Sequence, residues 1–158
     1  MHETLKQPEW VESFGDSIYD LCVCTLWHTA HAQHAFRVIT RTIEQKKNQN
    51  QFETYLRPWI FKIAVETLRT MFAKNARKPS ALEQVSLDSE LSLEEKFARF
   101  ELYFHKLSFD EKVVLLLRDK YGLPYSEIAA IFSLPEDSIK LRRTLALRTL
   151  DDSIWKPQ

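Results

Sequence analysis

The most informative segment of this 158-residue chain is residues 125–150, which read YSEIAAIFSLPEDSIKLRRTLALRTL. Residues 125–132 have the apolar spacing of a short helix. Ser133-Leu134 supplies a turn, and Pro135-Glu136-Asp137 begins a second helix with its acids near the positive end of the helix dipole. Ile139 is the apolar residue that would hold the second helix against the first. The segment therefore predicts a short helix and a second helix joined by a tight turn.

This arrangement is typical of the helix-turn-helix, in which the second helix lies in the major groove of DNA and flanking cations bind phosphates. The second predicted helix carries four such cations, Lys140, Arg142, Arg143 and Arg148. Two packed helices with a tight turn also occur in proteins that do not bind DNA. The motif alone therefore leaves open both a DNA-reading module and a plain packing unit.

The composition extends the helical prediction to the rest of the chain. Its two Gly and six Pro make up about 5% of the residues, against roughly 12% in average usage. β-Sandwiches, barrels and propellers need frequent turns, which Gly and Pro make most easily. The same shortage excludes the Gly-rich loops that bind nucleotide phosphates, and with them most ATPases, kinases and dehydrogenases.

Apolar residues recur at three- and four-residue spacing in five further segments, as expected for amphipathic helices. These segments are residues 11–27, 32–47, 57–78, 92–107 and 108–121. Ser92 and Ser108 are expected to cap their helices because each is followed three residues later by Glu. Gly122 is expected to end the last of the five.

Residues 79–92 lose this periodicity and have the composition of a linker. The predicted fold is therefore all-α, with two small helical modules, residues 1–78 and 93–158, joined by this linker. The C-terminal module contains the helix-turn-helix.

The net charge is zero, but the charges are unevenly distributed. Residues 1–36 carry a net charge of −4, residues 37–78 of +7, residues 79–139 of −6 and residues 140–158 of +3. Two basic blocks separated by an acidic one favour two separate contacts with a polyanion such as DNA. The alternative is that these charges only solvate helix faces.

The sequence predicts a cytoplasmic protein without a membrane contact. No apolar run approaches the ~20 residues that cross a bilayer, and no signal peptide is visible at the N-terminus. Cys22 and Cys24 lie too close together for a useful disulfide, which favours a reducing compartment.

Several segments resemble the extracytoplasmic-function sigma factors of bacterial RNA polymerase. Their promoter-reading domain is matched by LSFDEKVVLLLR at residues 107–118, YGLPYSEIA at 121–129 and SIKLR at 138–142. Their promoter-melting helix is matched by LRPWIFKIA at residues 56–64, and their polymerase-clamping helix begins near AQHAF at residues 32–36. The resemblance covers roughly residues 14–150.

The resemblance implies a role for each module. The N-terminal module would bind core RNA polymerase and melt the downstream promoter element, and the second helix of the helix-turn-helix would read the upstream element. The implied DNA contacts of that helix are Glu136, Ser138, Lys140, Leu141, Arg142, Arg143 and Arg148. The implied contacts for melting are Trp59, Lys62, Arg69, Lys74, Arg77 and Lys78, and the implied polymerase contacts are His34, Arg37, Val38 and Arg41.

Melting requires cations along the strand and aromatic or apolar surfaces that receive unstacked bases. Trp59 and Phe61 are the aromatic candidates, and core packing is the alternative for Trp59. Glu66 stands where the family usually has Asn, and its carboxylate would repel DNA phosphates. The family's clamping helix usually carries acids, whereas His34, Arg37, Val38 and Arg41 stand here. The missing acids should weaken docking to polymerase or change the partner.

The second helix also departs from the family pattern. A small polar residue is usual at the position of Leu141, a basic residue at Leu145 and an apolar core residue at Arg143. Leu141 and Leu145 lie four residues apart and share the face expected to meet DNA. Either the helix is slightly rotated, or this face binds protein instead.

Cys24, His28 and His31, with His34 beyond, are candidate metal ligands, since these residues would share one arc of a continuous helix. The resemblance instead implies a turn near residues 28–31, where histidines are usually solvated or cap a helix. No nucleophile–base pair or carboxylate pair is placed for catalysis. We expect no metal, no cofactor and no enzymatic activity.

Three hypotheses follow. The first is a sigma subunit that binds core RNA polymerase and promoter DNA. The second is a sigma-like interaction protein that binds an anti-sigma factor or another regulator without initiating transcription. The third is a helix-turn-helix regulator that acts without polymerase.

Overall fold

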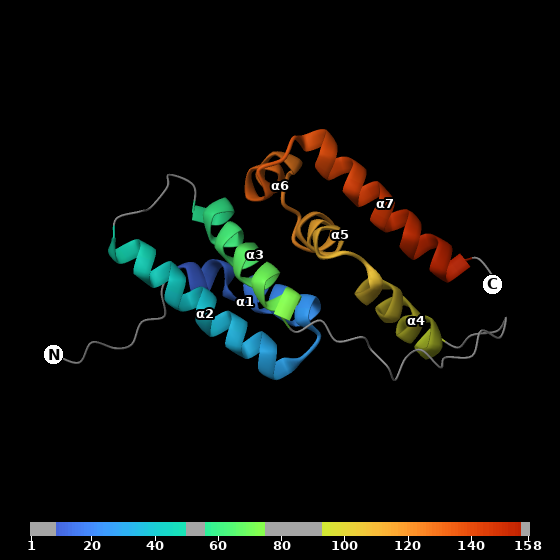
Figure 1. Ribbon diagram of the computed structural model, residues 1–158, viewed down its shortest axis with the longest axis horizontal. Coiled ribbons are helices and arrows are strands. Elements are labelled where there is room, and N and C mark those ends of the chain that lie inside the picture. The colour runs from blue at the N-terminus through green and yellow to red at the C-terminus, as the bar shows by residue number, and fades with distance from the viewer. Residues whose placement is uncertain (1–8, 50–55, 75–92, 156–158) are drawn as a thin grey trace. The chain divides into compact units, whose positions relative to one another are not determined.

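The structure is a computed structural model that describes residues 9–49, 56–74 and 93–155 (Figure 1). Its elements are α1 (Glu9–Leu26), α2 (Thr29–Asn48), α3 (Leu56–Lys74), α4 (Leu93–Lys106), α5 (Phe109–Leu115), the π-helical turn η1 (Leu116–Lys120), α6 (Tyr125–Phe132) and α7 (Glu136–Trp155). No strand occurs within these ranges, so the all-α prediction is confirmed. The linker expected at 79–92, the cap Ser92 and the cations Arg77 and Lys78 lie outside the described residues.

The chain divides into two compact units, which are described separately below. The first comprises Met1–Asn75 with Ala130–Ser133, and the second comprises Ala76–Ala129 with Leu134–Gln158. Within the described ranges, no helix is both long enough and apolar enough to cross a membrane.

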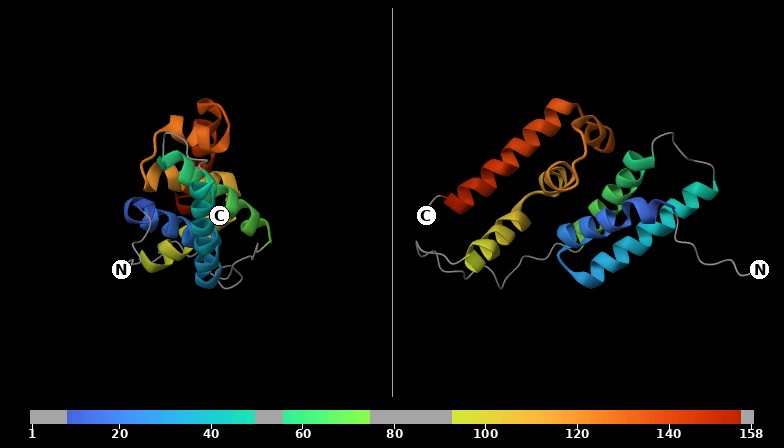
Figure 2. Two further views of the ribbon diagram at one scale, coloured as in Figure 1. Left: turned by 90° about the vertical axis from the view of Figure 1, so that its left-hand side faces the viewer. Right: turned by 180° about the vertical axis from the view of Figure 1, so that it is seen from behind.

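The first unit is built on α1, α2 and α3, each of which packs against the other two (Figures 1 and 2). The packing follows from the amphipathic pattern, and α2 shows this most clearly. Its residues Ala32, Ala35, Ile39 and Ile43 form one stripe and are fully buried. The Phe36 ring contacts the rings of Trp10 and Tyr19, with centroids 6.0 and 5.6 Å away.

The turn between α1 and α2 lies where the resemblance implied one. α1 ends at Leu26, and Trp27 has a positive φ of 51°. His28 caps α2 because its ring nitrogen accepts a hydrogen bond from the backbone N–H of His31, at 3.4 Å. This break interrupts the helical arc that a metal site would need. Among the described residues, no group of three or more His, Cys, Asp or Glu is arranged to hold a metal ion.

In the second unit, α7 packs against both α4 and α5 (Figure 2). Leu107, Leu115, Ala146 and Leu150 form a buried apolar cluster there. Ser108 caps α5 as predicted, since its hydroxyl accepts from the Glu111 N–H at 3.2 Å.

The helix expected over residues 108–121 is not uniform. α5 ends at Leu115, and the chain continues as the π-helical turn η1, which closes with the Tyr121 N–H donating to the Leu116 carbonyl at 2.9 Å. Gly122 follows with a φ of 71° and ends the helix as predicted. The wider turn was not predicted, because the apolar spacing is compatible with an ordinary α-helix.

Candidate nucleic-acid interface

The backbone of residues 125–155 forms the predicted helix-turn-helix. α6 ends at Phe132, and Ser133 adopts a positive φ of 55°. The Leu134 N–H donates to the Ala129 carbonyl at 3.0 Å, which closes the turn. α7 then begins at Glu136, and the Pro135 carbonyl accepts from the N–H groups of Ser138 and Ile139.

Three residues define the inward side of α7. Ile139 and Ala146 are fully buried, and Leu150 is 6% exposed. They are spaced by seven and four residues and therefore lie on one stripe of the helix. With this stripe turned inward, Leu141 and Leu145 point outward and are 58% and 43% exposed. α7 is therefore not rotated about its axis in a way that would bury the two leucines. We call residues Asp137, Leu141, Thr144, Leu145 and Arg148 the outer face of α7.

Arg142 flanks the inward stripe and is tied to α5. Its guanidinium donates to an Asp110 carboxylate oxygen at 2.9 Å. The two side chains are 37% and 22% exposed, so the pair is only partly solvated. Arg142 therefore neutralises a carboxylate of its own unit and orients α7.

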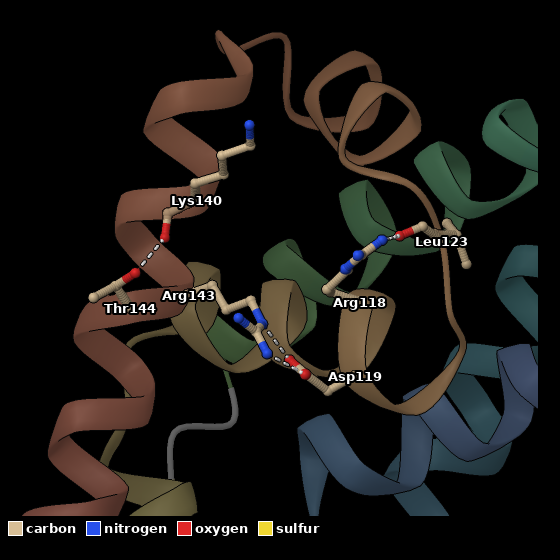
Figure 3. Close-up of polar contacts among 6 residues, drawn as sticks. All are labelled: Arg118, Asp119, Leu123, Lys140, Arg143 and Thr144. Atoms are coloured by element: carbon tan, nitrogen blue, oxygen red, sulfur yellow. Dashed lines mark hydrogen bonds and ion pairs between the residues drawn. The ribbon is translucent and has the colours of Figure 1, made fainter.

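Arg143 flanks the inward stripe on the other side and makes a bidentate pair with Asp119 of η1 (Figure 3). Its Nε and Nη2 atoms lie 2.8 and 2.6 Å from the two carboxylate oxygens. These hydrogen bonds hold the pKa of Arg143 above its ordinary value. Asp119 thus explains how a cation is accommodated where the family usually has an apolar core residue.

Lys140 is exposed near the start of α7 and does not join the Arg143 pair (Figure 3). Its ammonium lies 5.5 Å from the centroid of the Tyr125 ring, and the guanidinium of Arg118 lies 4.4 Å from the same ring. Arg118 also donates to the Leu123 carbonyl at 3.2 Å. Arg148, in the middle of α7, is exposed on its outer face. Glu136 is exposed and Ser138 half-buried at the first turn.

The aromatic residues predicted to receive unstacked bases are not available for that role in this structure. Trp59 is 8% exposed and Phe61 is 1% exposed. The Phe61 ring contacts the ring of Phe14 at 6.4 Å between centroids. Their burial favours the core-packing alternative stated for Trp59, since a base-stacking surface requires an open ring face.

The cations of α3 remain at the surface. Lys62 is half-buried, and Arg69 and Lys74 are exposed. Glu66 is exposed on the same side of the helix as Lys62 and Arg69, since the three are spaced by four and three residues.

The residues predicted to meet polymerase lie together on α2, opposite its buried stripe. His34, Arg37 and Arg41 are exposed, and Val38 is half-buried. We call these four residues the outer face of α2. Their spacing of three and four residues places them on one side of the helix, so this surface is cationic rather than acidic.

The carboxylate partners of Arg142 and Arg143 could not be predicted from the sequence. Asp110 and Asp119 lie 32 and 24 residues before the arginines that they bind. No local spacing rule connects residues so far apart, because i,i+3 and i,i+4 patterns report only on one helix. The one available signal was Arg143 at an expected core position, which required a carboxylate nearby.

Comparison with known proteins agrees with this geometry. Residues 98–150 match the family model for Sigma-70, region 4. The chain is 25% identical over 139 residues to the ECF RNA polymerase sigma-E factor of Escherichia coli K12, a match that covers 77% of this chain and 71% of that protein. The resemblance to the extracytoplasmic-function sigma factors is confirmed. The sigma-E factor of Haemophilus influenzae gives a similar result, with 26% identity over 140 residues.

The fold is also that of a solved sigma factor. The chain is similar to the sigma factor RpoE of Bartonella quintana, which was crystallised in complex with the anti-sigma factor NepR. The TM-score is 0.70, and the match covers 94% of this chain and 96% of that one. At 19% identity this likeness concerns the sigma-factor fold.

Proposed function

We propose that this protein is a transcription initiation subunit that binds core RNA polymerase and directs it to specific promoters. The observation that carries the proposal is the anchoring of α7. Ile139, Ala146 and Leu150 fix this helix as the second helix of a helix-turn-helix and leave its outer face exposed. The segment lies within the match to Sigma-70, region 4, so its geometry and its similarity point to the same role.

Under this proposal, the four cations of α7 have two different roles. Lys140 and Arg148 are exposed and would bind phosphates beside the upstream promoter element. Arg142 and Arg143 act as positioning residues, because their charges are paired with Asp110 and Asp119. Glu136 and Ser138 lie in the first turn of α7, the part of a recognition helix that contacts base edges.

The N-terminal unit would hold polymerase through the outer face of α2 and contact the melted strand through α3. The proposed strand contacts are the surface cations Lys62, Arg69 and Lys74, continued in sequence by Arg77 and Lys78. Such contacts are electrostatic and follow the backbone. The proposed role requires no cofactor and no catalytic residue, and it would be carried out where core polymerase is found, in the cytoplasm.

A second candidate function is a sigma-like interaction protein that binds an anti-sigma factor without initiating transcription. Two observations favour it. Leu141 and Leu145 expose apolar surface on α7, and the outer face of α2 is cationic where the family usually has acids. The similar RpoE chain was solved with an anti-sigma factor bound.

Capture of purified core RNA polymerase by the full chain, followed by run-off transcription on a promoter library, separates these candidates. Polymerase binding with initiation supports the proposal. Polymerase binding without initiation at any promoter contradicts it and favours the interaction protein. Sequence-specific DNA binding without polymerase binding indicates a regulator of the third kind.

Matched variants of α7 test the assignment of its cations. Lys140→Ala and Arg148→Ala should each lower the dependence of log affinity on log salt by about one unit, as loss of one phosphate contact does. Arg142→Ala is the control, because its charge is already paired with Asp110 and the salt dependence should stay unchanged. The assignment fails if Arg142→Ala lowers the salt dependence and the other two variants do not.

A further inference from the structure

The outer face of α7 exposes two leucines that the fold does not use. Leu141 is 58% exposed and Leu145 is 43% exposed, while Ile139 and Ala146 on the inward stripe are fully buried. Single exposed leucines are common on protein surfaces. Here two of them lie four residues apart on the same side of the helix, which makes a continuous apolar strip.

We infer that Leu141 and Leu145 determine promoter specificity by contacting thymine methyl groups in the major groove. The inference rests on the proposed function, because it requires α7 to enter the groove of the upstream promoter element. It adds to that function the class of base that the strip selects, which is thymine at the positions facing Leu141 and Leu145.

The chemistry of the base edges supports this assignment. In the major groove, guanine presents two acceptors, adenine one acceptor and one donor, and cytosine a donor, whereas thymine adds an apolar C5-methyl group. A leucine side chain has neither donor nor acceptor, so it complements only the methyl group. Placed over guanine, it would cover N7 and O6 without supplying a hydrogen bond, which is unfavourable. The strip therefore favours thymine and disfavours guanine.

The surrounding charges favour DNA as the occupant of this strip. Lys140 precedes Leu141 directly, and Arg148 lies three residues after Leu145; both cations are exposed. An apolar strip flanked by cations suits a groove that has methyl groups on its floor and phosphates on both walls.

The dimensions of the strip set the expected spacing of the thymines. Residues four apart on an α-helix are separated by about 6 Å along its axis, and successive bases in a strand are separated by about 3.4 Å. The two leucines thus extend over roughly two base steps. We expect the two selected methyl groups to lie one or two base pairs apart.

Substitution of deoxyuridine for thymine tests the inference, since it removes the methyl group and leaves the hydrogen-bonding pattern of the base unchanged. The full chain is assembled with core polymerase on a promoter selected by the run-off assay. Each thymine of the upstream element is then replaced in turn, and affinity is measured. At one or two positions we expect a loss of about fourfold, which is the ~0.8 kcal/mol of one buried methyl group converted at 1.4 kcal/mol per tenfold.

The protein variants identify the side chain that reads the methyl group. If Leu141 or Leu145 contacts a thymine methyl group, its replacement by Ala should abolish the preference for thymine over deoxyuridine at the promoter position that faces this side chain. Leu147→Ala is the control, because Leu147 is a 38% exposed leucine of α7 outside its outer face; it should keep the preference. All three positions are exposed, so these changes should leave folding intact.

Three outcomes overturn the inference while leaving the proposed function in place. One is an affinity for the promoter that is insensitive to every deoxyuridine substitution. Another is a methyl preference that persists unchanged in Leu141→Ala and Leu145→Ala. The third is loss of polymerase binding in these two variants, which would assign the strip to a protein partner. Failure of the wild-type chain to initiate at any promoter contradicts the proposed function itself.

Discussion

The helices α2 and α7 each contain 20 residues, yet they use their cations in opposite ways. α2 is held by an entirely apolar stripe, and Arg37 and Arg41 are exposed on the opposite side. On α7, Arg142 and Arg143 flank the inward stripe and pair with Asp110 and Asp119. The number of cations in a helix therefore overestimates the charge that it offers to DNA. What counts is where the carboxylates of the packed neighbours lie.

The comparison also separates two kinds of stabilisation. The position of α2 depends on burial of apolar side chains, which carry no charge for salt to screen and no group for pH to titrate. The position of α7 depends in addition on ion pairs that are partly exposed and therefore screened by salt. The predictions below test this difference from the largest expected effect to the smallest.

The largest effect is expected from truncating the buried stripes. Ile39→Ala in α2 and Ile139→Ala in α7 each remove a fully buried side chain, and each should cost about 2–4 kcal/mol of unfolding free energy. Urea unfolding followed by circular dichroism measures the loss. The two variants should differ in function, because only Ile139→Ala releases the helix that carries the candidate contacts with the upstream promoter element. Equal loss of specific DNA binding in both would contradict the division of roles.

The second prediction concerns pH and the unit that contains α7. Lys112 is 1% exposed, and its ammonium lies 3.3 Å from Nδ1 of His105. Burial, reinforced by the Lys112 charge, lowers the pKa of His105 to about 3. Unfolded His105 has a pKa near 6.5, so the unfolded state binds more protons between pH 6.5 and 3. The second unit should lose stability as pH falls through this window.

The unfolding free energy should change with pH by less than the one-proton limit of about 1.4 kcal/mol per pH unit, because the half-buried His105 ring retains part of its hydration. Urea midpoints measured on either side of pH 6 report it. His105→Gln keeps an acceptor for Lys112 but does not titrate, so it should flatten the dependence. A slope as steep in this variant as in the wild type would assign the effect to other groups.

The third prediction concerns the Arg143–Asp119 pair, whose side chains are 31% and 41% exposed. A double-mutant cycle of Arg143→Ala and Asp119→Asn should give a coupling energy of about 0.5–1 kcal/mol that decreases with added salt. Asp119→Asn should also release the Arg143 charge and raise non-specific DNA affinity at low salt. The double variant is the control and should lose this gain. A gain that survives without Arg143 would mean that the pair does not withhold the charge from DNA.

The helices and the turn of the helix-turn-helix could be predicted because their signals are local. Apolar spacing, the Ser108 cap and Gly122 all act within a few residues, and the structure confirms each of them. The π-helical turn at Leu116–Lys120 could not be predicted, since five apolar and charged residues in this order fit an α-helix equally well. The direction of Leu141 was left open by the sequence, and the structure exposes it because Ile139 is buried on the opposite side of the same helix.

The pairing and burial of the site residues depend on tertiary contacts that spacing does not report. Arg142 has the sequence context of a DNA contact. Only the packing of α5 against α7 shows that its guanidinium is paired with the Asp110 carboxylate. Trp59 lies in the first turn of α3, where the sequence is compatible with either exposure or burial, and the structure leaves it 8% exposed. Sequence patterns thus place charges and rings on helix faces, while their availability is set by the neighbouring elements.

The smallest stability effect is expected from the outer face of α2. Arg37→Ala and Arg41→Ala should change the unfolding free energy by less than ~0.5 kcal/mol, because both side chains are exposed. Arg142→Ala in α7 removes the same charge but breaks the pair with Asp110, and should cost up to ~1 kcal/mol. The order reverses for polyanion binding, because Arg37 and Arg41 are exposed whereas Arg142 is paired with Asp110. Urea unfolding measures the effect on stability, and the salt concentration of elution from heparin measures the effect on polyanion binding. If the three variants rank in the same order in both measurements, the distinction between the two helices fails.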